Sequence, residues 1–311
     1  MSAPAPALPS AVELARAARV LVVRSRREVS SAFAGGYRSA FRGGGVEFEE
    51  SRPYAPGDDV HRLDWNALAR TGTPYVKRFR EERDQSVVLA VDRSGSMAFA
   101  SAGRTKAALA AHAAALVAGA AARAGDRIGL VAFAREVEEE LPPERGAPAL
   151  FHRLERLAAA AAAPTGPGGL EPVLARLELA LRRPAVVILL SDFRDEALDR
   201  SAPAGLGLAR LARRHDVVAA VVSDPREEEL PAAGTVLLGD AERPGPRLRL
   251  RTSAAARERY RAAAAERRVR LERALRAGGA DVVWLRTDRD PLLPLARFFA
   301  RRPAHPRRGP R

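Results

Sequence analysis

Short runs of consecutive apolar residues, rich in valine, isoleucine and leucine, alternate with longer segments in which apolar positions recur at helical spacing. Uninterrupted apolar runs of this length are typical of strands that are covered on both faces of a parallel sheet. The runs lie at 86–92, 127–133, 185–193, 216–223 and 281–285. This alternation predicts an α/β fold with a doubly wound, mostly parallel sheet flanked by helices.

The segments between the runs predict the helices that cover this sheet. We expect helices at 104–124, 147–163, 171–182, 206–214, 253–277 and 291–300, with an edge strand at 136–141 and a short strand at 235–238. The most apolar of these segments, 107–122, is short, contains His112 and is flanked by Lys106 and Arg123. A membrane-spanning helix needs about 20 mainly apolar residues. We therefore predict a buried helix here and no membrane span.

The first 85 residues follow a different pattern. Apolar positions between 11 and 34 predict an amphipathic helix, and the glycines at 35–36 and 43–45 predict a flexible basic linker. Strands are expected at 46–51 and 74–79. The predicted organisation is a disordered stretch at 1–10, an N-terminal helix, glycine-rich linker and β-containing segment at 11–85, the α/β domain at 86–300, and a basic, proline-rich tail at 301–311.

Three acids and a histidine lie close together in the N-terminal segment, at Asp58, Asp59, His61 and Asp64. Such a cluster can bind a metal, but acids near a helix start more often cap the helix and form ion pairs. We favour the structural role for this cluster.

The net charge of +14 is concentrated near the C-terminus. Residues 241–311 contain 20 Lys and Arg against 7 Asp and Glu, an excess of 13. This excess suggests a second possible function, binding of nucleic acid or another acidic surface through the Arg-rich C-terminal region. The simpler interpretation is a solvated helix face. The chain contains no cysteine and no signal pattern at its N-terminus, so we expect a cytoplasmic protein.

Candidate chemistry lies where two of the predicted strands end. The run 86–92 ends at Asp92, and Ser94 and Ser96 follow at alternate positions; the run 185–193 contains Asp192 near its end. Because parallel strands end at the same edge of a sheet, Asp192 is expected near Asp92. Carboxylate and hydroxyl oxygens suit Mg²⁺, Mn²⁺ or Ca²⁺. The pattern therefore favours a divalent-cation site, although a polar strand-to-helix turn would use the same residue types.

Motifs for several enzyme classes are absent from the sequence. A haloacid-dehalogenase phosphatase needs a second carboxylate two residues after the first, where this chain has Ser94. Neither serine lies in G-x-S-x-G, no histidines form H-E-x-x-H, and no G-x-x-x-x-G-K-[ST] loop is present. We therefore expect a protein without catalytic activity of its own.

Several motifs occur in a characteristic order. They are Tyr54-Ala-Pro-Gly-Asp-Asp-Val-His-Arg-Leu-Asp-Trp-Asn66, Arg70-Thr-Gly72, Asp92-Arg-Ser-Gly-Ser-Met97, Gly125-Asp-Arg-Ile-Gly-Leu-Val-Ala-Phe133 and Ser191-Asp-Phe193. With these motifs the chain resembles a von Willebrand factor A domain and, more narrowly, domain-of-unknown-function family 58. The resemblance covers about residues 40–240.

The resemblance implies a metal-ion-dependent adhesion site, in which a partner's Asp or Glu completes the coordination of Mg²⁺, Mn²⁺ or Ca²⁺. Asp92, Ser94, Ser96 and Asp192 match its ligands, and Thr165 stands two or three residues before the position of the expected threonine. We expect weaker or more water-filled coordination for that reason. Members of this family often accompany a MoxR-type AAA+ ATPase, which implies a role as its adaptor or chaperone-like partner.

Overall fold

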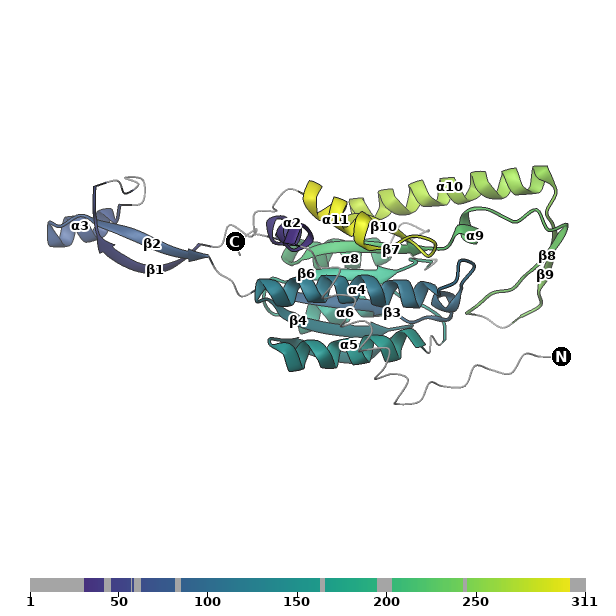
Figure 1. The fold of residues 1–311 in the computed structure, drawn as a ribbon, viewed down its shortest axis with the longest axis horizontal. Coiled ribbons are helices and arrows are strands. Elements are labelled where there is room, and N and C mark those ends of the chain that lie inside the picture. Colours follow the sequence, from purple (N-terminus) through teal and green to yellow (C-terminus); the bar gives the residue numbers. More distant parts are fainter. Residues whose placement is uncertain are drawn as a thin grey trace.

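The computed structural model describes residues 31–41, 46–56, 58, 63–81, 85–162, 166–194, 203–242 and 245–302. The centre of the fold is a six-stranded sheet with the strand order β10-β7-β6-β3-β4-β5 (Figure 1). The strands are β3 (Ser86–Asp92), β4 (Arg127–Phe133), β5 (Val137–Glu144), β6 (Val186–Ser191), β7 (Asp216–Ser223) and β10 (Asp281–Arg286). All neighbours are parallel except β4 and β5. The predicted α/β fold with a mostly parallel central sheet is thus confirmed.

Helices cover both faces of the sheet. The helices of the described chain, of which α3 lies apart from the central sheet, are α2 (Ser31–Phe41), α3 (Trp65–Thr71), α4 (Lys106–Ala124), α5 (Ala147–Ala162), α6 (Glu171–Ala180), α8 (Pro203–Arg214), α9 (Pro225–Glu228), α10 (Ala254–Ala277) and α11 (Leu292–Arg301). In β3, Val87, Leu89 and Val91 join the core formed with α2, α4, α5 and α11. Val88 and Ala90 join a second core with α6, α8 and α10. Successive side chains of a strand point to opposite faces, so these strand residues are buried in one core or the other.

Helix α4 is long and apolar enough to cross a membrane by length and composition, and it alone meets this test among the described residues. Most of the helix is buried inside the fold, where it packs against β3, β4 and α5. Thr105 caps its N-terminus, and Gly125, with a φ of 82°, ends it. A φ of this sign is the left-handed backbone conformation, which glycine adopts more readily than other residues at a helix end. The predicted buried helix therefore matches the observed one.

The glycine pair at 35–36 lies inside helix α2, so the prediction of a flexible linker at these residues is wrong. Tyr37 and two phenylalanines of α2 pack around Phe299 of α11, with the Tyr37 and Phe299 ring centroids 5.7 Å apart. Tyr37 also donates a hydrogen bond to Asp126, at 3.0 Å. This packing outweighs the low helix propensity of glycine, which costs only about 1 kcal/mol per residue. The expectations for 1–30, 43–45 and 303–311 lie outside the described residues.

A small unit precedes the central sheet and lies at one end of the molecule (Figure 1). It consists of the antiparallel strands β1 (Val46–Pro53) and β2 (Tyr75–Glu81) with helix α3, and both strands were predicted. Asp64 caps α3 by accepting a hydrogen bond from the Ala67 N–H, and Asp58 pairs with Arg52 at 2.6 Å. These two acids of the N-terminal cluster therefore have the structural role that we favoured, and the other two members of the cluster lie outside the described residues.

Strands β8 (Thr235–Leu238) and β9 (Leu248–Arg251) form a separate antiparallel pair between β7 and α10. The strand at 235–238 was predicted, whereas the four-residue β9 was not. The alternation of Leu and Arg in β9 is short and lies among arginine-rich segments, so it did not stand out as a strand pattern. The residues between the two strands reach the edge of the sheet where β3 and β6 end.

Candidate functional site

The candidate site lies at the carboxyl ends of β3 and β6, which are neighbours in the sheet. From β3 the chain passes through α4 to β4 on one side, whereas β6 lies on the other side and continues to β7. Connections that leave in opposite directions open a crevice at such a switch point, where ligands bind in open α/β sheets. Asp92 is the last residue of β3 and Ser191 the last residue of β6. The sheet therefore brings together the two segments whose polar residues the sequence singled out.

Asp92 is held by hydrogen bonds from both sides of the crevice. One carboxylate oxygen, Oδ1, accepts from the Ser94 N–H at 2.8 Å, and the other, Oδ2, accepts from the Ser191 hydroxyl at 2.5 Å. The side-chain oxygens of Ser94 and Ser96 lie 3.1 Å apart. All four residues are at least 90% buried. Four oxygen-bearing side chains are thus fixed around one small volume.

The loop that carries these serines is tightly enclosed. A Cβ atom on Gly95 would lie 2.5 Å from the carbonyl oxygen of Ala241. Gly95 also donates its N–H to the carbonyl oxygen of Gly166, at 2.8 Å. Only glycine permits such a close backbone approach. The 166–169 and 239–242 segments therefore form the walls of the crevice.

A cleft of about 20 Å³ lies between these walls. Its lining includes Asp92, Ser94, Asp192 and Glu242, and Glu242 accepts a hydrogen bond from the Gly168 N–H at 3.0 Å. A space of this size holds about one water molecule or one ion. Sequence reasoning missed Glu242, because a single acid in a loop 50 residues beyond Asp192 carries no local signal.

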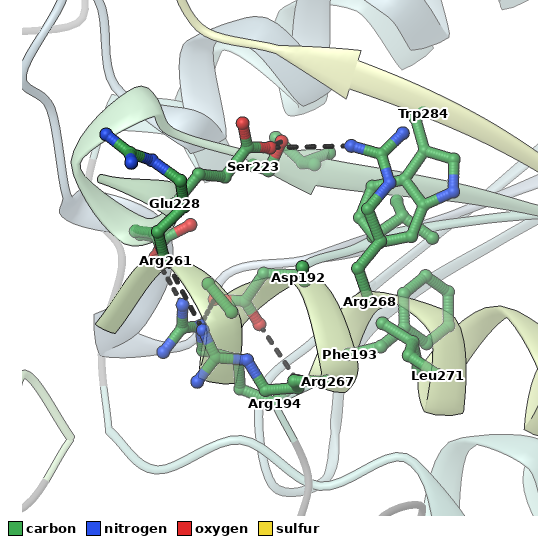
Figure 2. A pocket seen from close by; sticks show the side chains of 15 residues that line it. Asp192, Phe193, Arg194, Ser223, Glu228, Arg261, Arg267, Arg268, Leu271 and Trp284 are labelled. Atoms are coloured by element: carbon green, nitrogen blue, oxygen red, sulfur yellow. Dashed lines mark hydrogen bonds and ion pairs between the residues drawn. The ribbon is translucent and has the colours of Figure 1, made fainter. Parts of the chain in front are cut away.

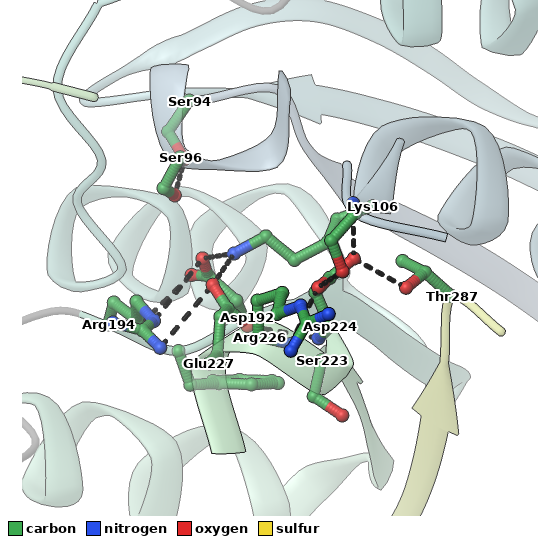
Figure 3. Close-up of polar contacts among 12 residues, drawn as sticks. Ser94, Ser96, Lys106, Asp192, Arg194, Ser223, Asp224, Arg226, Glu227 and Thr287 are labelled. Carbon is green, nitrogen blue, oxygen red and sulfur yellow. Dashed lines mark hydrogen bonds and ion pairs between the residues drawn. The ribbon is translucent and has the colours of Figure 1, made fainter. Parts of the chain in front are cut away.

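Asp192 has a buried cationic partner. The Lys106 ammonium lies 2.5 Å from Asp192 Oδ2 and 2.6 Å from Glu227 Oε1 (Figure 3). The side chain of Lys106 is 0% exposed. Arg194 adds a second positive charge, with its Nη2 atom 3.3 Å from Glu227. Buried lysines are rare and occur in pairs with acids, so this network compensates the negative charge of Asp192.

Sequence reasoning also missed Lys106 as a site residue and treated it as a charged flank of an apolar helix. One signal was available, since Lys77 and Lys106 are the only lysines among 52 basic residues. An ammonium is a compact charge that fits between two carboxylates, whereas guanidinium is planar and larger. A lysine in a chain whose other basic residues are almost all arginines therefore indicates a position with room for an ammonium group but not for a guanidinium group.

The pKa of Asp92 is raised to about 7 by its burial and, secondarily, by the negative charge of Asp192. Hydrogen bonds from Ser191 and Ser94 act in the opposite direction. Two carboxylates in a low-dielectric site repel each other, and a cation between them removes that repulsion.

Asp224 anchors the loop that leads into α4. It accepts hydrogen bonds from the Ser101 N–H and hydroxyl and, at 2.6 Å, from the Thr287 hydroxyl. Arg104 donates to the carbonyl oxygen of Thr287 at 2.7 Å. These contacts tie the residues before α4 to the ends of β7 and β10. They thereby set the position of Lys106 at the start of the helix.

Phe193 separates the cleft from a larger pocket on the other side. Its φ of 51° is the only positive value for a non-glycine residue in the described part of the chain. The Ser191 hydroxyl oxygen accepts a hydrogen bond from the Phe193 N–H at 2.9 Å, which holds this turn. Such backbone strain is concentrated at functional sites.

The metal-site prediction can be compared with this geometry residue by residue. The structure brings Asp92, Ser94, Ser96 and Asp192 to one edge of the sheet, as the strand pattern predicted. Thr165 lies outside the described residues. Oxygen donors of this kind fit Mg²⁺, Mn²⁺ or Ca²⁺. In the described residues no three His, Cys, Asp or Glu side chains form a metal cluster, so hydroxyls and water would complete the coordination.

The loop that follows Thr165 lies against the serine loop. A Cβ atom on Gly168 would lie 3.3 Å from the Cβ atom of Ser94. A contact this close leaves little room for a larger residue at position 168. The loop in which the resemblance places the threonine ligand therefore does reach the cleft.

Four of the eight arginines of α10 have acidic partners. Arg261 pairs with Glu229 and Glu258, and Arg268, Arg270 and Arg276 each pair with one glutamate. Paired guanidinium groups are less available to phosphates than free ones. Helix α10 thus carries ion-paired arginines and, at Arg257, Arg259, Arg267 and Arg273, arginines with no acidic partner among the described residues.

Comparison with protein families gives one match over most of the chain. Residues 50–270 match DUF58, described as a protein of unknown function. The chain belongs to the DUF58 family. Uncharacterized protein Rv1480 of Mycobacterium tuberculosis and uncharacterized protein Mb1516 of Mycobacterium bovis are each 35% identical to it over 294 residues, covering 93% of this chain and 90% of theirs.

More distant similarities extend beyond DUF58. The magnesium-chelatase 60 kDa subunit of Cereibacter sphaeroides is 31% identical over 204 residues, which cover 63% of this chain and 34% of that subunit. Among solved structures, BatB from Bacteroides thetaiotaomicron shares 13% identity with a TM-score of 0.41, covering 70% of this chain and 98% of that one. An aerotolerance-related membrane protein from Bacteroides fragilis shares 13% identity with a TM-score of 0.46, covering 69% of this chain and 98% of that one.

Proposed function

We propose that this DUF58 protein is a divalent-cation-dependent protein-binding module with a von Willebrand factor A-like fold. In this proposal Asp92, Ser94, Ser96 and Asp192 hold Mg²⁺, or Mn²⁺ or Ca²⁺, directly or through water. An Asp or Glu of a partner protein completes the coordination. The observation that supports it best is that buried Asp92, Ser94 and Asp192 line a cleft of about 20 Å³, with the Ser96 hydroxyl 3.1 Å from that of Ser94.

Lys106 makes the proposed site weaker than one with two fully available carboxylates. Its ammonium occupies Oδ2 of Asp192, and an incoming ion competes with it for that carboxylate. Mg²⁺ commonly keeps several of its waters and needs only one or two carboxylates. Contact with Asp192 through water is therefore compatible with the ion pair to Lys106.

We propose a binding role without catalysis. The described residues that line the cleft include no histidine or lysine to act as a general base. The acids that line the cleft all have structural partners: Asp92 accepts two hydrogen bonds, Asp192 faces a buried ammonium, and Glu242 accepts a hydrogen bond from the Gly168 N–H. The cleft also has room for one ion or water molecule but not for a substrate.

The partner that we propose is a MoxR-type AAA+ ATPase, with this chain as its cytoplasmic adaptor or chaperone-like partner. The family resemblance supports this choice. The absence of a phosphate-binding loop in the sequence also fits a division of labour in which the partner hydrolyses ATP. The similarity to the magnesium-chelatase 60 kDa subunit, which its name describes as part of a larger enzyme, is consistent with a role for this chain in a protein assembly.

The first test is metal binding by the isolated chain. After treatment with chelator, titration with Mg²⁺, Mn²⁺ and Ca²⁺ is followed by calorimetry and by the thermal unfolding midpoint. Ser94→Ala and Asp192→Asn are expected to lose the metal response, whereas Ser39→Ala, at an exposed position of α2, keeps it. A response that is unchanged in Ser94→Ala would exclude the proposed site.

The second test concerns the partner. A co-purification with the MoxR-type ATPase of the same genome is carried out with Mg²⁺ and with chelator. Binding that requires Mg²⁺ and is lost in Ser94→Ala supports the proposal. Binding that persists in chelator contradicts metal-mediated recognition. Affinity that falls steeply with salt and requires residues 297–311 would instead favour the Arg-rich C-terminal region as an acidic-surface binder.

A further inference from the structure

A second hollow lies beside the cleft, at the carboxyl ends of β6, β7 and β10. It has a volume of about 320 Å³ and is closed on one side by α10 (Figure 2). Ligand pockets in proteins range from about 300 to 1,000 Å³. We call this hollow the Trp284 pocket, defined by Phe193, Val221, Leu271, Trp284, Arg267 and Arg268. It shares Asp192, Phe193 and Arg194 with the cleft but is far larger, at 320 against 20 Å³.

The inner part of the Trp284 pocket is apolar and aromatic. Phe193 follows β6, Val221 lies near the end of β7, and Trp284 belongs to β10. Ala264 and Leu271 contribute from α10, where residues seven apart lie on the same face. These side chains leave a slot that an organic ring or branched apolar group fits better than an ion does.

Guanidinium groups lie around this apolar part. Arg268 stacks on Trp284, with its Cζ atom 4.1 Å from the ring centroid, and Arg194 and Arg267 lie on another side of the pocket (Figure 2). Stacking fixes the plane of the guanidinium. Its Nη1 atom lies 3.5 Å from Glu228, and the remaining N–H donors point sideways from the ring. The pocket therefore offers oriented donors next to an apolar surface.

The acids of the pocket are already compensated. Lys106 contacts both Asp192 and Glu227 from inside the fold, and Glu228 lies 3.1 Å from Arg286. Arg267, in contrast, has no carboxylate partner among the residues that the structure describes, and its guanidinium donates only a long hydrogen bond, 3.4 Å, to the carbonyl oxygen of Glu227. The charge that remains unmatched in the pocket is positive.

We propose that the Trp284 pocket binds a small organic anion, an aromatic or branched apolar group that carries a carboxylate, sulfonate or phosphate. The apolar group lies against Trp284, Phe193 and Leu271, and the anionic group accepts hydrogen bonds from Arg267 and Arg268. This binding uses none of the oxygen donors of Ser94 and Ser96. The two sites share Asp192 in their lining, but the proposed hydrogen-bond donors to the anion, Arg267 and Arg268, are not part of the proposed metal site.

The test uses 8-anilinonaphthalene-1-sulfonate, a fluorescent aromatic sulfonate, with the full chain in the presence of EDTA. The wild type is expected to bind one molecule with saturable fluorescence and energy transfer from Trp284. Arg267→Gln is expected to weaken binding about tenfold or more, since a hydrogen bond to a charged group is worth about 1.5–3 kcal/mol and 1.4 kcal/mol corresponds to a factor of ten. Ala264→Phe, which fills the pocket, is expected to abolish binding.

Two matched variants on the same helix serve as controls. Arg259→Gln makes the same charge change and Ala263→Phe the same size change, and both positions are exposed and outside the pocket. Both are expected to bind as the wild type does. Equal binding by Arg267→Gln and Arg259→Gln would overturn the proposal, as would a probe signal that does not saturate. Thermal unfolding of each variant shows whether Ala264→Phe folds, and the Arg267→Gln comparison holds if it does not.

Competition distinguishes the source of the anion. Displacement of the probe by AMP indicates a phosphate-bearing ligand, and displacement by indole-3-acetate indicates a carboxylate-bearing one. Failure of both at millimolar concentration would contradict the proposed ligand class. Because all measurements are made in EDTA, loss of the proposed metal function leaves these outcomes unchanged.

Discussion

Lys106→Met tests whether the buried ion network holds the candidate site together. The substitution keeps the length and apolar stem of the side chain but removes the ammonium that contacts Asp192 at 2.5 Å and Glu227 at 2.6 Å. The two acids, with side-chain exposures of only 4% and 14%, then keep only the more distant Arg194 as a cationic partner, 3.9 Å from Asp192 and 3.3 Å from Glu227. Breaking a buried pair by removing one partner costs about 3–5 kcal/mol. We expect a loss of that size in the free energy of unfolding.

The assay is denaturant unfolding in chelator, in which a stability change shifts the midpoint without changing the slope. Arg123→Met, at an exposed position of the same helix, is expected to change stability by about 0.5 kcal/mol or less. The double variant Lys106→Met/Asp192→Asn is expected to recover part of the loss, because it removes an unpaired buried charge. A loss below about 1 kcal/mol for Lys106→Met would refute a strong buried network.

Adding Mg²⁺ extends the same experiment to the proposed metal site. Without the ammonium, an ion no longer competes with Lys106 for Asp192, so Mg²⁺ is expected to stabilise Lys106→Met more than the wild type. Stabilisation by a ligand at about 100 times its Kd is about 2.7 kcal/mol. An equal Mg²⁺ effect in both proteins would show that Lys106 and the ion do not share Asp192.

Three further predictions concern positions outside this network. Burial lowers the pKa of His215 to about 4 in the fold, and neither ring nitrogen has a hydrogen-bond partner among the described residues. The stability that the neutral ring contributes is therefore full above about pH 6.5 and falls as the pH drops toward 4. His215→Leu should flatten this pH dependence of the unfolding midpoint, and His152→Leu, at an exposed position, should not. Gly95→Ala should destabilise the protein and abolish any metal response, because the new Cβ atom would lie 2.5 Å from a backbone oxygen. Gly35→Ala, whose Cβ atom would meet nothing within 4 Å, should instead stabilise α2 by about 0.5–1 kcal/mol, as measured by thermal unfolding. Phe299→Ala should lower the free energy of unfolding by about 3–5 kcal/mol and make α2 sensitive to proteolysis. Leu293→Ala, at a position on the same helix that is 61% exposed, should change neither the stability nor the proteolysis appreciably.

The positions of Asp92 and Asp192 could be predicted because both follow continuous apolar runs. Such runs identify buried parallel strands, and parallel strands end at one edge. That prediction did not require β3 and β6 to be adjacent strands. Their adjacency in the sheet is, however, the reason that the Ser191 hydroxyl reaches the Asp92 carboxylate. The role of Asp64 as a cap was predictable for a similar reason, since capping depends on a few adjacent residues.

Other parts of the site depend on residues far apart in the chain. Lys106 and Glu227 are 121 positions apart, and Gly168 and Glu242 are 74 apart. Nothing in the local pattern around either acid distinguishes it from the many acids on the surface. The helical state of the glycine pair in α2 likewise depends on Phe299, which lies near the other end of the chain.

The sequence by itself determined the α/β class, the strands of the central sheet and the polar residues at the ends of β3 and β6, because the spacing of apolar residues reports local burial. The tertiary structure alone decided which charges neutralise each other and where space is left between elements. Lys106 therefore became part of the site only when α4 was placed beside β6 and α9. The Trp284 pocket likewise exists only because α10 crosses the ends of three strands. Charge pairing and cavities are relations between surfaces, which local periodicity does not encode.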